Sequence, residues 1–218
     1  MIVNWIRLGE DTVTVGKIVC LGRNYRAHAQ ELGNPVPQEP VIFLKPSSSI
    51  IHDGDSIIIP PRSQDVHHEV ELAVLIGKEA RHVDRADAMD HVRGWGVLLD
   101  MTARDIQSRA KDKGLPWSVA KGFDTFCPVS DFVERNVVND PANLSIRLEV
   151  NGEVRQDGST AHMIFPVDFI IHYISHIMTL YPGDLIATGT PEGVARVDPG
   201  DRLLASVEGV GSLSVGVK

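Results

Sequence analysis

Two glutamates lie two residues apart in the stretch VHHEVELAVLIG, residues 66–77. Side chains alternate across a β-strand, so Glu69 and Glu71 point to the same face, with their Cα atoms about 7 Å apart. That face continues with Ala73 and Leu75 and so becomes apolar along its length. It is either the solvated face of an edge strand or the boundary of a core. At a core boundary the two acids need a cation, because like charges this close raise each other's pKa.

A third acid tests whether a metal ion could be that cation. Asp100 ends an apolar run in GWGVLLDMTARDIQ and directly precedes a helical pattern. An aspartate in this place is also a common helix N-cap, which is the alternative. Three carboxylates at the ends of adjacent strands would form an open half-site for Mg²⁺ or Mn²⁺, which leaves positions for water or substrate. The predicted metal ligands are Glu69, Glu71 and Asp100.

A histidine and a glutamate could supply a general base. His28 and Glu31 lie three residues apart in a helical pattern and share one face. They are either part of an exposed amphipathic helix or a dyad in which Glu31 orients His28 and His28 deprotonates water. Histidine suits this task because its pKa lies near neutrality. The segment GNPVPQEP, residues 33–40, cannot be helix interior and could act as a lid hinge.

Several donors could hold an anion. Lys121 lies between apolar residues in PWSVAKGF and is either a surface lysine or, if buried near the acids, a donor to an oxyanion. The segment ATGTPEG, by itself, is only a glycine-rich turn. Arg104 and Gln107 share a helical face after Asp100, although a solvated face is the alternative. The candidates for binding a substrate carboxylate are Arg23, Lys45, Arg104 and Gln107.

Composition limits the class of protein. The 218 residues are 43% hydrophobic and 23% charged, which is typical of a folded domain. The net charge of −8, with no basic block, argues against nucleic acid or an anionic membrane as the main partner. It permits a small anionic substrate if local cations reverse the field at one site. Two distant cysteines and no recognisable signal peptide or transmembrane run favour the cytoplasm.

The elements that must position these residues are mostly strands. The pair around Asn151-Gly152 is the clearest hairpin, since a type I′ turn needs positive φ at both central residues. No repeat or linker divides the chain, so we expect one domain. The predicted strands are Ile18–Gly22, Val41–Lys45, Ser56–Ile59, His67–Ile76, Gly94–Asp100, Leu144–Val150, Glu153–Gln156, Asp184–Thr188, Arg202–Val207 and Ser212–Val217.

Helical patterns are fewer. Asp84 is a plausible N-cap, and Thr102 with Asp105 has the spacing of a capping box. Many strands, few helices and no regular βαβ alternation predict an α+β, mostly β architecture. The predicted helices are Asn24–Leu32, Asp84–His91, Thr102–Lys113 and Val167–Leu180.

Several motifs together resemble a known family. GRNYRAHAQELG, PVIFLKP, HHEVELAVLIG, LLDMTARDIQ, GLPWSVAKGFDTFCPVS, VNGEVRQDGST and LIATGTPEGV occur in the order and spacing of the fumarylacetoacetate hydrolase family, from about Lys17 to the C-terminus. The chain is similar to the short branch, which includes acylpyruvate hydrolases, fumarylpyruvate hydrolases and oxaloacetate decarboxylases. The resemblance implies a mixed β-sandwich roll with a few peripheral helices, assembled as a homodimer.

The resemblance also implies roles for the candidate residues. It assigns Mg²⁺ or Mn²⁺ to Glu69, Glu71 and Asp100, and a lid that closes over the substrate to the helix carrying His28 and Glu31. It makes Lys121 a catalytic donor beside the metal and Thr190, in ATGTPEG, a substrate contact. Residues 1–218 would form one catalytic domain, with 1–16 as an N-terminal extension.

The expected activity is metal-dependent hydrolysis of the C–C bond of an acylpyruvate such as fumarylpyruvate or acetylpyruvate. Water activated by His28 and Glu31 would attack the C4 carbonyl and release pyruvate. Three alternatives stay open: an oxaloacetate decarboxylase, a hydroxy-dienedioate isomerase or decarboxylase at the same site, and a metal-stabilised binding protein without catalysis.

Overall fold

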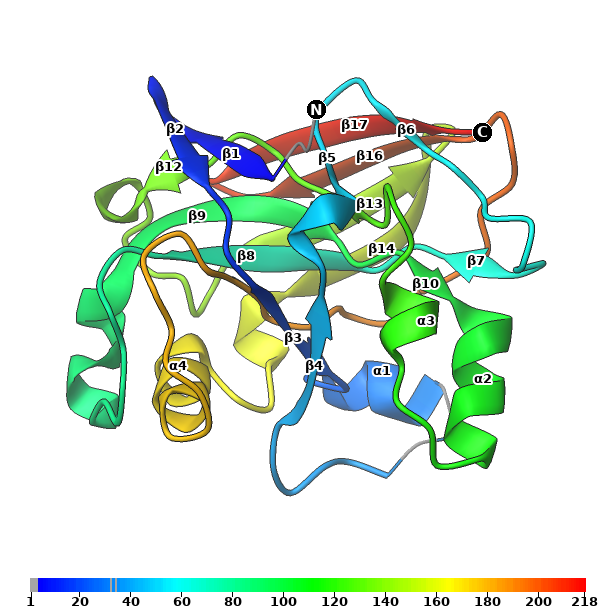
Figure 1. Cartoon of the computed structure of the whole chain (residues 1–218). Helices are drawn as coiled ribbons and strands as arrows, with labels where there is room; N and C mark the ends of the chain where they lie inside the picture. The colour runs from blue at the N-terminus through cyan, green and yellow to red at the C-terminus, as the bar shows by residue number, and fades with distance from the viewer. Residues whose placement is uncertain (1–3, 32, 34) are drawn as a thin grey trace.

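A computed structural model describes residues 4–31, 33 and 35–218 of the chain. Two mixed sheets dominate the described part and face each other across a common core (Figure 1). The larger sheet has the order β12 (Val133–Glu134), β9 (Val92–Leu99), β8 (Val70–Ile76), β15 (Leu185–Ala187), β3 (Ile18–Gly22) and β4 (Val41–Lys45). The second has the order β14 (Glu153–Ser159), β13 (Ser145–Val150), β16 (Arg202–Val207), β17 (Gly211–Val217) and β6 (Ser56–Ile57).

Short elements surround the sheets. α1, α2 and α3 gather at one end of the larger sheet, away from α4 (Figure 1). The helices are α1 (Arg26–Glu31), α2 (Arg104–Asp112), α3 (Ser118–Lys121) and α4 (Val167–Ser175), with 3₁₀ turns η1 (Ser47–Ser49), η2 (Arg85–His91), η3 (Arg135–Val137) and η4 (Thr160–His162). Two-stranded pairs join β1 (Trp5–Leu8) to β2 (Asp11–Thr14), β7 (Val66–His67) to β10 (Thr102–Ala103), and β5 (Ile50–Ile51) to β11 (Cys127–Pro128).

The side chains of strand β8 alternate between two apolar clusters on opposite faces of the larger sheet. Leu72 and Val74 face the cluster between the two sheets, whereas Ala73 and Leu75 face a second cluster behind the larger sheet. All seven residues of β8 are buried because β9 and β15 pair with it on either side. Glu71 therefore belongs to a central strand and Glu69 directly precedes it, so the edge-strand interpretation is wrong.

The strand predictions are largely confirmed. β3, β4 and β16 have the predicted bounds, and the hairpin at Asn151-Gly152 has φ of +53° and +81° at its two turn residues. The predicted strand His67–Ile76 is interrupted at His68 and Glu69, so that it forms β7 and β8. The predicted Gly94–Asp100 begins earlier, at Val92, and ends at Leu99.

The helix predictions need corrections. The segment expected over Asp84–His91 is a 3₁₀ helix, and the Asp84 side chain makes no capping bond. The capping box is wrong, because Thr102 and Ala103 pair with β7 and α2 starts at Arg104. α1 is shorter than predicted at its start, and Leu32, the predicted end, lies outside the described residues. α4 ends at Ser175, before the predicted Leu180. Among the described residues, no helix is long and apolar enough to cross a membrane.

Candidate active site

Four strand ends meet at the candidate site. β3 and β15 are parallel and both end there, which delivers Arg23 after β3 and the turn Thr188–Pro191 after β15. β8 starts there and β9, its antiparallel partner, ends there, so Glu69 and Asp100 lie next to each other. The Asp100 backbone N–H donates to the Glu69 carbonyl over 2.8 Å. The sheet topology thus brings residues 23, 69, 100 and 190 to one edge.

The three predicted ligand carboxylates form one group. Glu69, Glu71 and Asp100 each offer an oxygen, and these oxygens lie within 4.8 Å of one another. The three residues are 5%, 1% and 0% exposed, so water does not compensate their charge. Asp100 is not a helix N-cap, since two residues separate it from the cap position of α2 at Ala103.

The buried Lys121 and the mostly buried Arg104 flank the group. The Lys121 Nζ pairs with Glu69 over 2.9 Å and also with Asp100, and Arg104 pairs with the other Glu69 oxygen. Lys121 is 2% exposed, so the surface-lysine alternative is wrong. Arg104 also donates to Gln107 over 2.7 Å, which confirms that the two share a face of α2.

Lys45 lies elsewhere than a substrate-binding residue should. Its Nζ pairs with Asp100 over 2.7 Å and donates to the Met101 and Lys121 carbonyls over 3.0 and 2.5 Å. Lys45 is 1% exposed and does not line the cleft described below. Lys45 instead holds Asp100 from behind, at the base of the site.

The pKa values of Glu69 and Glu71 are shifted in opposite directions. Burial raises the pKa of Glu69, but Lys121 and Arg104 outweigh it and hold that pKa well below its usual range. Burial also raises the pKa of Glu71, and here Asp100 and Glu69 raise it further, so the net shift is upward. Glu71 is the acid that the surrounding cations leave least compensated.

The donor set fits a hard divalent cation. Glu71 accepts a hydrogen bond of 2.7 Å from the Gly189 N–H, and no lysine or arginine of the described residues forms an ion pair with it. A dication would supply the missing charge. All three donors are carboxylate oxygens, the ligands that Mg²⁺ and Mn²⁺ favour.

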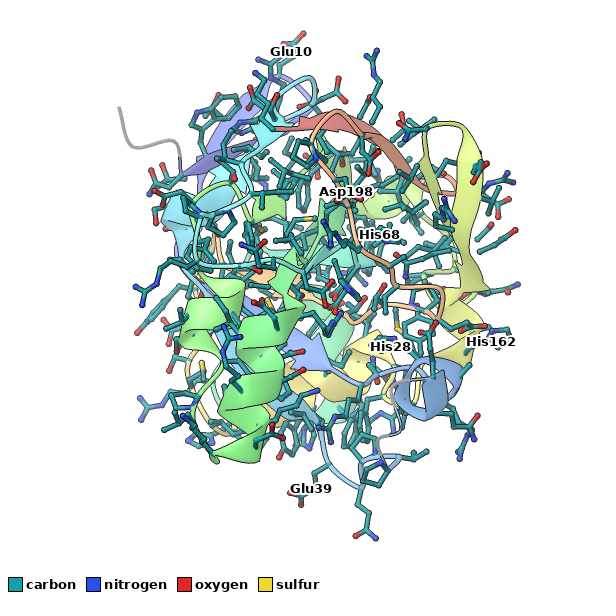
Figure 2. All side chains as sticks on the ribbon, turned by 90° about the vertical axis from the view of Figure 1, so that its right-hand side faces the viewer. Glu10, His28, Glu39, His68, His162 and Asp198 are labelled. Carbon is teal, nitrogen blue, oxygen red and sulfur yellow. The ribbon has the colours of Figure 1, made fainter. Side chains whose placement is uncertain are left out.

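The predicted dyad also forms. His28 is 4% exposed, and its Nδ1 lies 3.4 Å from a Glu31 carboxylate oxygen. Glu31 accepts from the Gly193 N–H as well, over 3.0 and 3.2 Å, so it joins α1 to the loop after β15. Burial lowers the pKa of His28, which keeps the ring neutral near pH 7. Figure 2 shows His28 at α1, facing the interior, whereas Glu39 extends outward.

These residues line a narrow cleft. It contains His28, Glu69, Glu71, Lys121 and, of the predicted substrate-binding residues, those at positions 23, 104, 107 and 190. Five lining residues were not among the sequence predictions: Leu21, Gly22, Phe43, Lys111 and Trp117. Lys111 had a usable signal, because positions 104, 107 and 111 follow the period of one helix face.

A buried glutamine supports the cleft from the second sheet. The Gln156 Oε1 accepts from the Val70 N–H over 3.1 Å and from the His68 ring over 3.0 Å. Its Nε2 donates to Thr190 Oγ1 over 2.8 Å and to the Pro191 carbonyl over 2.9 Å. Gln156 therefore ties the start of β8 to the turn after β15. Figure 2 shows His68 deep within the molecule.

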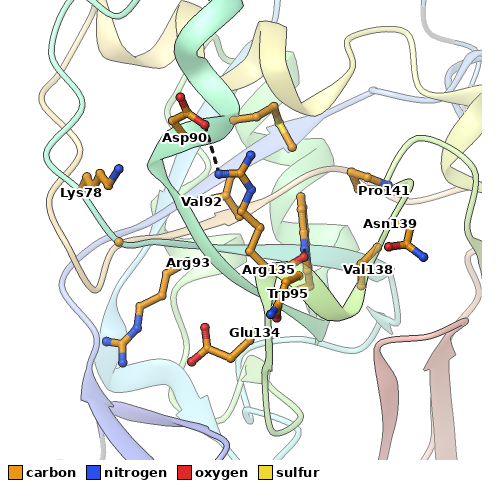
Figure 3. A pocket seen from close by; sticks show the side chains of 13 residues that line it. Lys78, Asp90, Val92, Arg93, Trp95, Glu134, Arg135, Val138, Asn139 and Pro141 are labelled. Carbon is orange, nitrogen blue, oxygen red and sulfur yellow. Dashed lines mark hydrogen bonds and ion pairs between the residues drawn. The ribbon is translucent and has the colours of Figure 1, made fainter.

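A wider hollow lies elsewhere, between η2, β9 and η3 (Figure 3). Its volume is about 920 Å³, and the ion pair of Asp90 with Arg135, 3.2 Å long, crosses it. Glu69 and Glu71 of the described metal-ligating group line the narrow cleft, and no member of that group lines this hollow. The free Cys20 and Cys127 are buried, and burial raises the pKa of the Cys127 thiol to about 12, so this cysteine is no nucleophile.

Comparison with known proteins decides the family. Residues 17–218 match the model of the fumarylacetoacetate (FAA) hydrolase C-terminal domain. The chain belongs to the fumarylacetoacetate hydrolase family. The fold is the mostly β, mixed-sheet fold of this family: it aligns with a TM-score of 0.94 and 36% identity to fumarylpyruvate hydrolase from Pseudomonas aeruginosa, solved in complex with Mn²⁺ and pyruvate. That alignment covers 98% of this chain and 94% of the other.

Relatives within the family have higher identity. The mitochondrial oxaloacetate tautomerase of Arabidopsis thaliana is 55% identical over 202 residues, which cover 93% of this chain and 91% of the relative. The mitochondrial oxaloacetate decarboxylase of Dictyostelium discoideum is 52% identical over 195 residues, 89% of each chain. The family expectation from the motifs is confirmed.

Proposed function

We propose that this protein is a divalent-metal-dependent enzyme that acts on oxaloacetate and interconverts its keto and enol forms. The observation that carries the proposal is the buried group Glu69–Glu71–Asp100, which faces a neutral histidine and a buried lysine in one cleft. The 55% identity to an oxaloacetate tautomerase supports it. The first expectation, acylpyruvate hydrolysis, becomes the second candidate.

The charge of the site favours a dianion. The formal charges of the three carboxylates equal those of Lys45, Lys121 and Arg104, while Arg23 and Lys111 also line the cleft. A bound Mg²⁺ or Mn²⁺ adds two positive charges, which a dianionic keto acid would neutralise. When bound, the dication would stabilise the negative charge that develops on the substrate oxygen.

His28 is the proposed proton carrier. Its Nδ1 faces Glu31, which leaves Nε2 as the nitrogen available to the cleft. Nε2 would accept a proton from C3 of oxaloacetate, while the electrons of that C–H bond form the C2=C3 double bond and the carbonyl pair moves to oxygen. A proton delivered to that oxygen completes the enol. Burial keeps His28 neutral and so able to accept the proton.

Lys121 acts as a donor and not as a base. Burial lowers its pKa, but Asp100 and Glu69 outweigh burial and raise the pKa above its ordinary value. The ammonium form therefore persists at neutral pH. It keeps Glu69 and Asp100 ionised and can donate a hydrogen bond to an oxygen that gains negative charge.

Hydrolysis of fumarylpyruvate is the second candidate, favoured by the structural match to fumarylpyruvate hydrolase. The same His28 would take a proton from water, and the hydroxide would attack the C4 carbonyl. Cleavage of the C3–C4 bond would then release fumarate and leave the bonding pair on C3 as pyruvate enolate, which takes up the proton from His28 to give pyruvate. Oxaloacetate decarboxylation needs no base, since the C3–C4 bond breaks as CO₂ leaves.

A substrate panel with one variant tests the proposal. Wild type and His28→Ala, each with Mg²⁺ or Mn²⁺, are assayed for enol ultraviolet absorbance, pyruvate release from oxaloacetate, and cleavage of fumarylpyruvate and acetylpyruvate. We expect fast tautomerisation, lost about 10²–10⁴-fold in His28→Ala. Decarboxylation that survives in the variant would assign that step to the metal site alone. Absence of tautomerisation in wild type would reject the proposal, and turnover of fumarylpyruvate alone would favour the hydrolase.

Assembly and location are part of the proposal. We propose one catalytic domain, a homodimer, as the family resemblance implies, and the cytoplasm. The buried, free cysteines are compatible with a reducing compartment. Light scattering on the purified protein tests the dimer.

A further inference from the structure

The cleft contains two cations that have no carboxylate partner. Within the described residues, the ion pairs of the cleft involve His28, Lys121 and Arg104. Arg23 and Lys111 also line the cleft, yet neither forms an ion pair with an acid of the described chain. Two unpaired cations beside a third, Arg104, repel one another unless an anion joins them.

Arg23 is held in an unusual conformation. Its φ is +61°, a left-handed value that non-glycine residues seldom adopt. Its Nε is buried and has no hydrogen-bond partner. A guanidinium pairs well with a carboxylate through two parallel N–H groups, so an unused buried Nε is a donor placed for such a ligand.

Lys111 completes the pair from α2. It lies seven residues, two helical turns, after Arg104, so both point to the cleft from one face. Its Nζ lies 5.4 Å from the centre of the Trp117 ring, and that ring packs against Phe43 at 5.6 Å. Burial, Arg23 and Arg104 lower the pKa of Lys111 to about 8. A half-buried lysine between two arginines is costly without an anion.

We propose that Lys111, together with Arg23, forms a second anion subsite that binds the distal carboxylate of a dianionic keto acid. The inference rests on the proposed function only in that the ligand is a keto acid. The first carboxylate and the keto oxygen would bind the dication that Glu69, Glu71 and Asp100 would hold. Lys111 is then a specificity-determining residue, which separates dianions such as oxaloacetate from monoanions such as pyruvate.

Binding of a matched pair of unreactive ligands tests this. (S)-Malate and (S)-lactate are the 2-hydroxy analogues of oxaloacetate and pyruvate and differ by the distal carboxylate. Their affinities for Mg²⁺-loaded protein are measured by calorimetry for wild type, Lys111→Met and Lys111→Arg. Lys113→Met is the matched control, since Lys113 is exposed, follows the same helix and does not line the cleft.

We expect malate to bind wild type more tightly than lactate. Lys111→Met should weaken malate at least tenfold and lactate less than twofold, because a hydrogen bond to a charged group is lost for malate alone. Lys111→Arg should restore most of the difference, and Lys113→Met should bind like wild type. The far-ultraviolet circular dichroism of every variant verifies folding.

Three results would overturn the subsite: equal weakening of both ligands in Lys111→Met, no weakening of malate, or no measurable malate binding to wild type. Failure of the proposed function looks different. An enzyme that leaves oxaloacetate unchanged but discriminates malate from lactate through Lys111 keeps the subsite and rejects the tautomerase. An enzyme that tautomerises oxaloacetate equally well with Lys111→Met keeps the tautomerase and rejects the subsite.

Discussion

Two glutamates of similar burial have different charge environments because of their neighbours. Lys121 and Arg104 pair with Glu69, whereas Glu71 is close to two other acids and accepts one backbone N–H. The pKa shifts of the two acids accordingly have opposite directions, downward for Glu69 and upward for Glu71. Glu71, two positions after Glu69, is thus the acid whose negative charge is stabilised only when a dication is present.

Replacing Glu71 should therefore change stability with opposite sign in the two metal states. In metal-free protein, Glu71→Gln removes a poorly compensated buried acid and keeps an oxygen for Gly189, so we expect about 1 kcal/mol higher unfolding free energy. With Mg²⁺ at 100 times its Kd, wild type should gain about 2.7 kcal/mol and the variant almost none. Urea unfolding with EDTA or Mg²⁺ measures both, with the exposed Glu153→Gln as control. An equal Mg²⁺ gain in Glu71→Gln would contradict Glu71 as a ligand.

The protonation of His28 should appear in the pH profile. The neutral ring is the active form, and burial lowers its pKa, so kcat/KM should fall only as pH drops below about 6.5. Contact with Glu31 raises this pKa. Glu31→Gln should therefore move the acidic limb of the kcat/KM profile to lower pH. It should also reduce kcat, since the His28 ring loses the carboxylate that orients it. Rates between pH 4.5 and 8 at saturating Mg²⁺ measure the limb. A wild-type midpoint above pH 7 would contradict this assignment.

At the scale of elements, strand bounds were predictable and the positions of the cations were not. β3 and β4 are short continuous apolar runs, and in β16 buried residues alternate with more exposed ones, so the local sequence is enough to fix these three strands. The sequence also showed that Glu69, Glu71, Ala73 and Leu75 share one face of the predicted strand. The short α3, which carries Lys121, has no periodicity of its own. Its position depends on distant contacts, such as Lys45 with the Lys121 carbonyl.

The interruption between β7 and β8 shows the same limit. Two adjacent histidines and a glutamate extend the strand pattern, yet the chain leaves the sheet at His68 and Glu69. The Gln156 side chain, from the second sheet, takes the Val70 N–H there. A partner 86 residues away in sequence cannot be inferred from local propensity. The role of Gln156 therefore became visible only in three dimensions.

The loop after β15 gives a prediction about α1. Gly193 has φ of +92°, and an added Cβ would lie 2.0 Å from the Arg155 carbonyl oxygen. Gly193→Ala should displace the loop and break its N–H contact with Glu31. We expect faster hydrogen exchange in residues 26–31 and a kcat at least tenfold lower. Gly200→Ala is the control, since Gly200 has φ of +100° but open space around its Cβ position. Equal effects of both variants would attribute the loss to backbone strain alone.

At the scale of the molecule, an overall negative charge coexists with a cation-rich cleft. The chain carries −8, yet its cleft contains Arg23, Arg104, Lys111 and Lys121. The fold creates this contrast, because Arg23 follows β3, Arg104 and Lys111 lie on α2, and Lys121 lies on α3, and all four line the same cleft. Net charge therefore excluded polyanionic partners at the sequence level without excluding a small dianion.

The balance of charge in the cleft predicts what metal removal does to the whole protein. Lys45, Lys121 and Arg104 compensate the carboxylates without a metal, so EDTA-treated protein should stay folded, unlike proteins whose fold requires a structural zinc. A metal contribution of about 2.7 kcal/mol corresponds to a Tm decrease of roughly 5–10 °C for a chain of this size. Activity should be lost on EDTA treatment and should return when Mg²⁺ or Mn²⁺ is added. Calorimetry, circular dichroism and turnover on the same sample measure all three. Unfolding by EDTA at 25 °C would mean that the lysines do not balance the acids, and full activity in EDTA would remove the metal from the reaction.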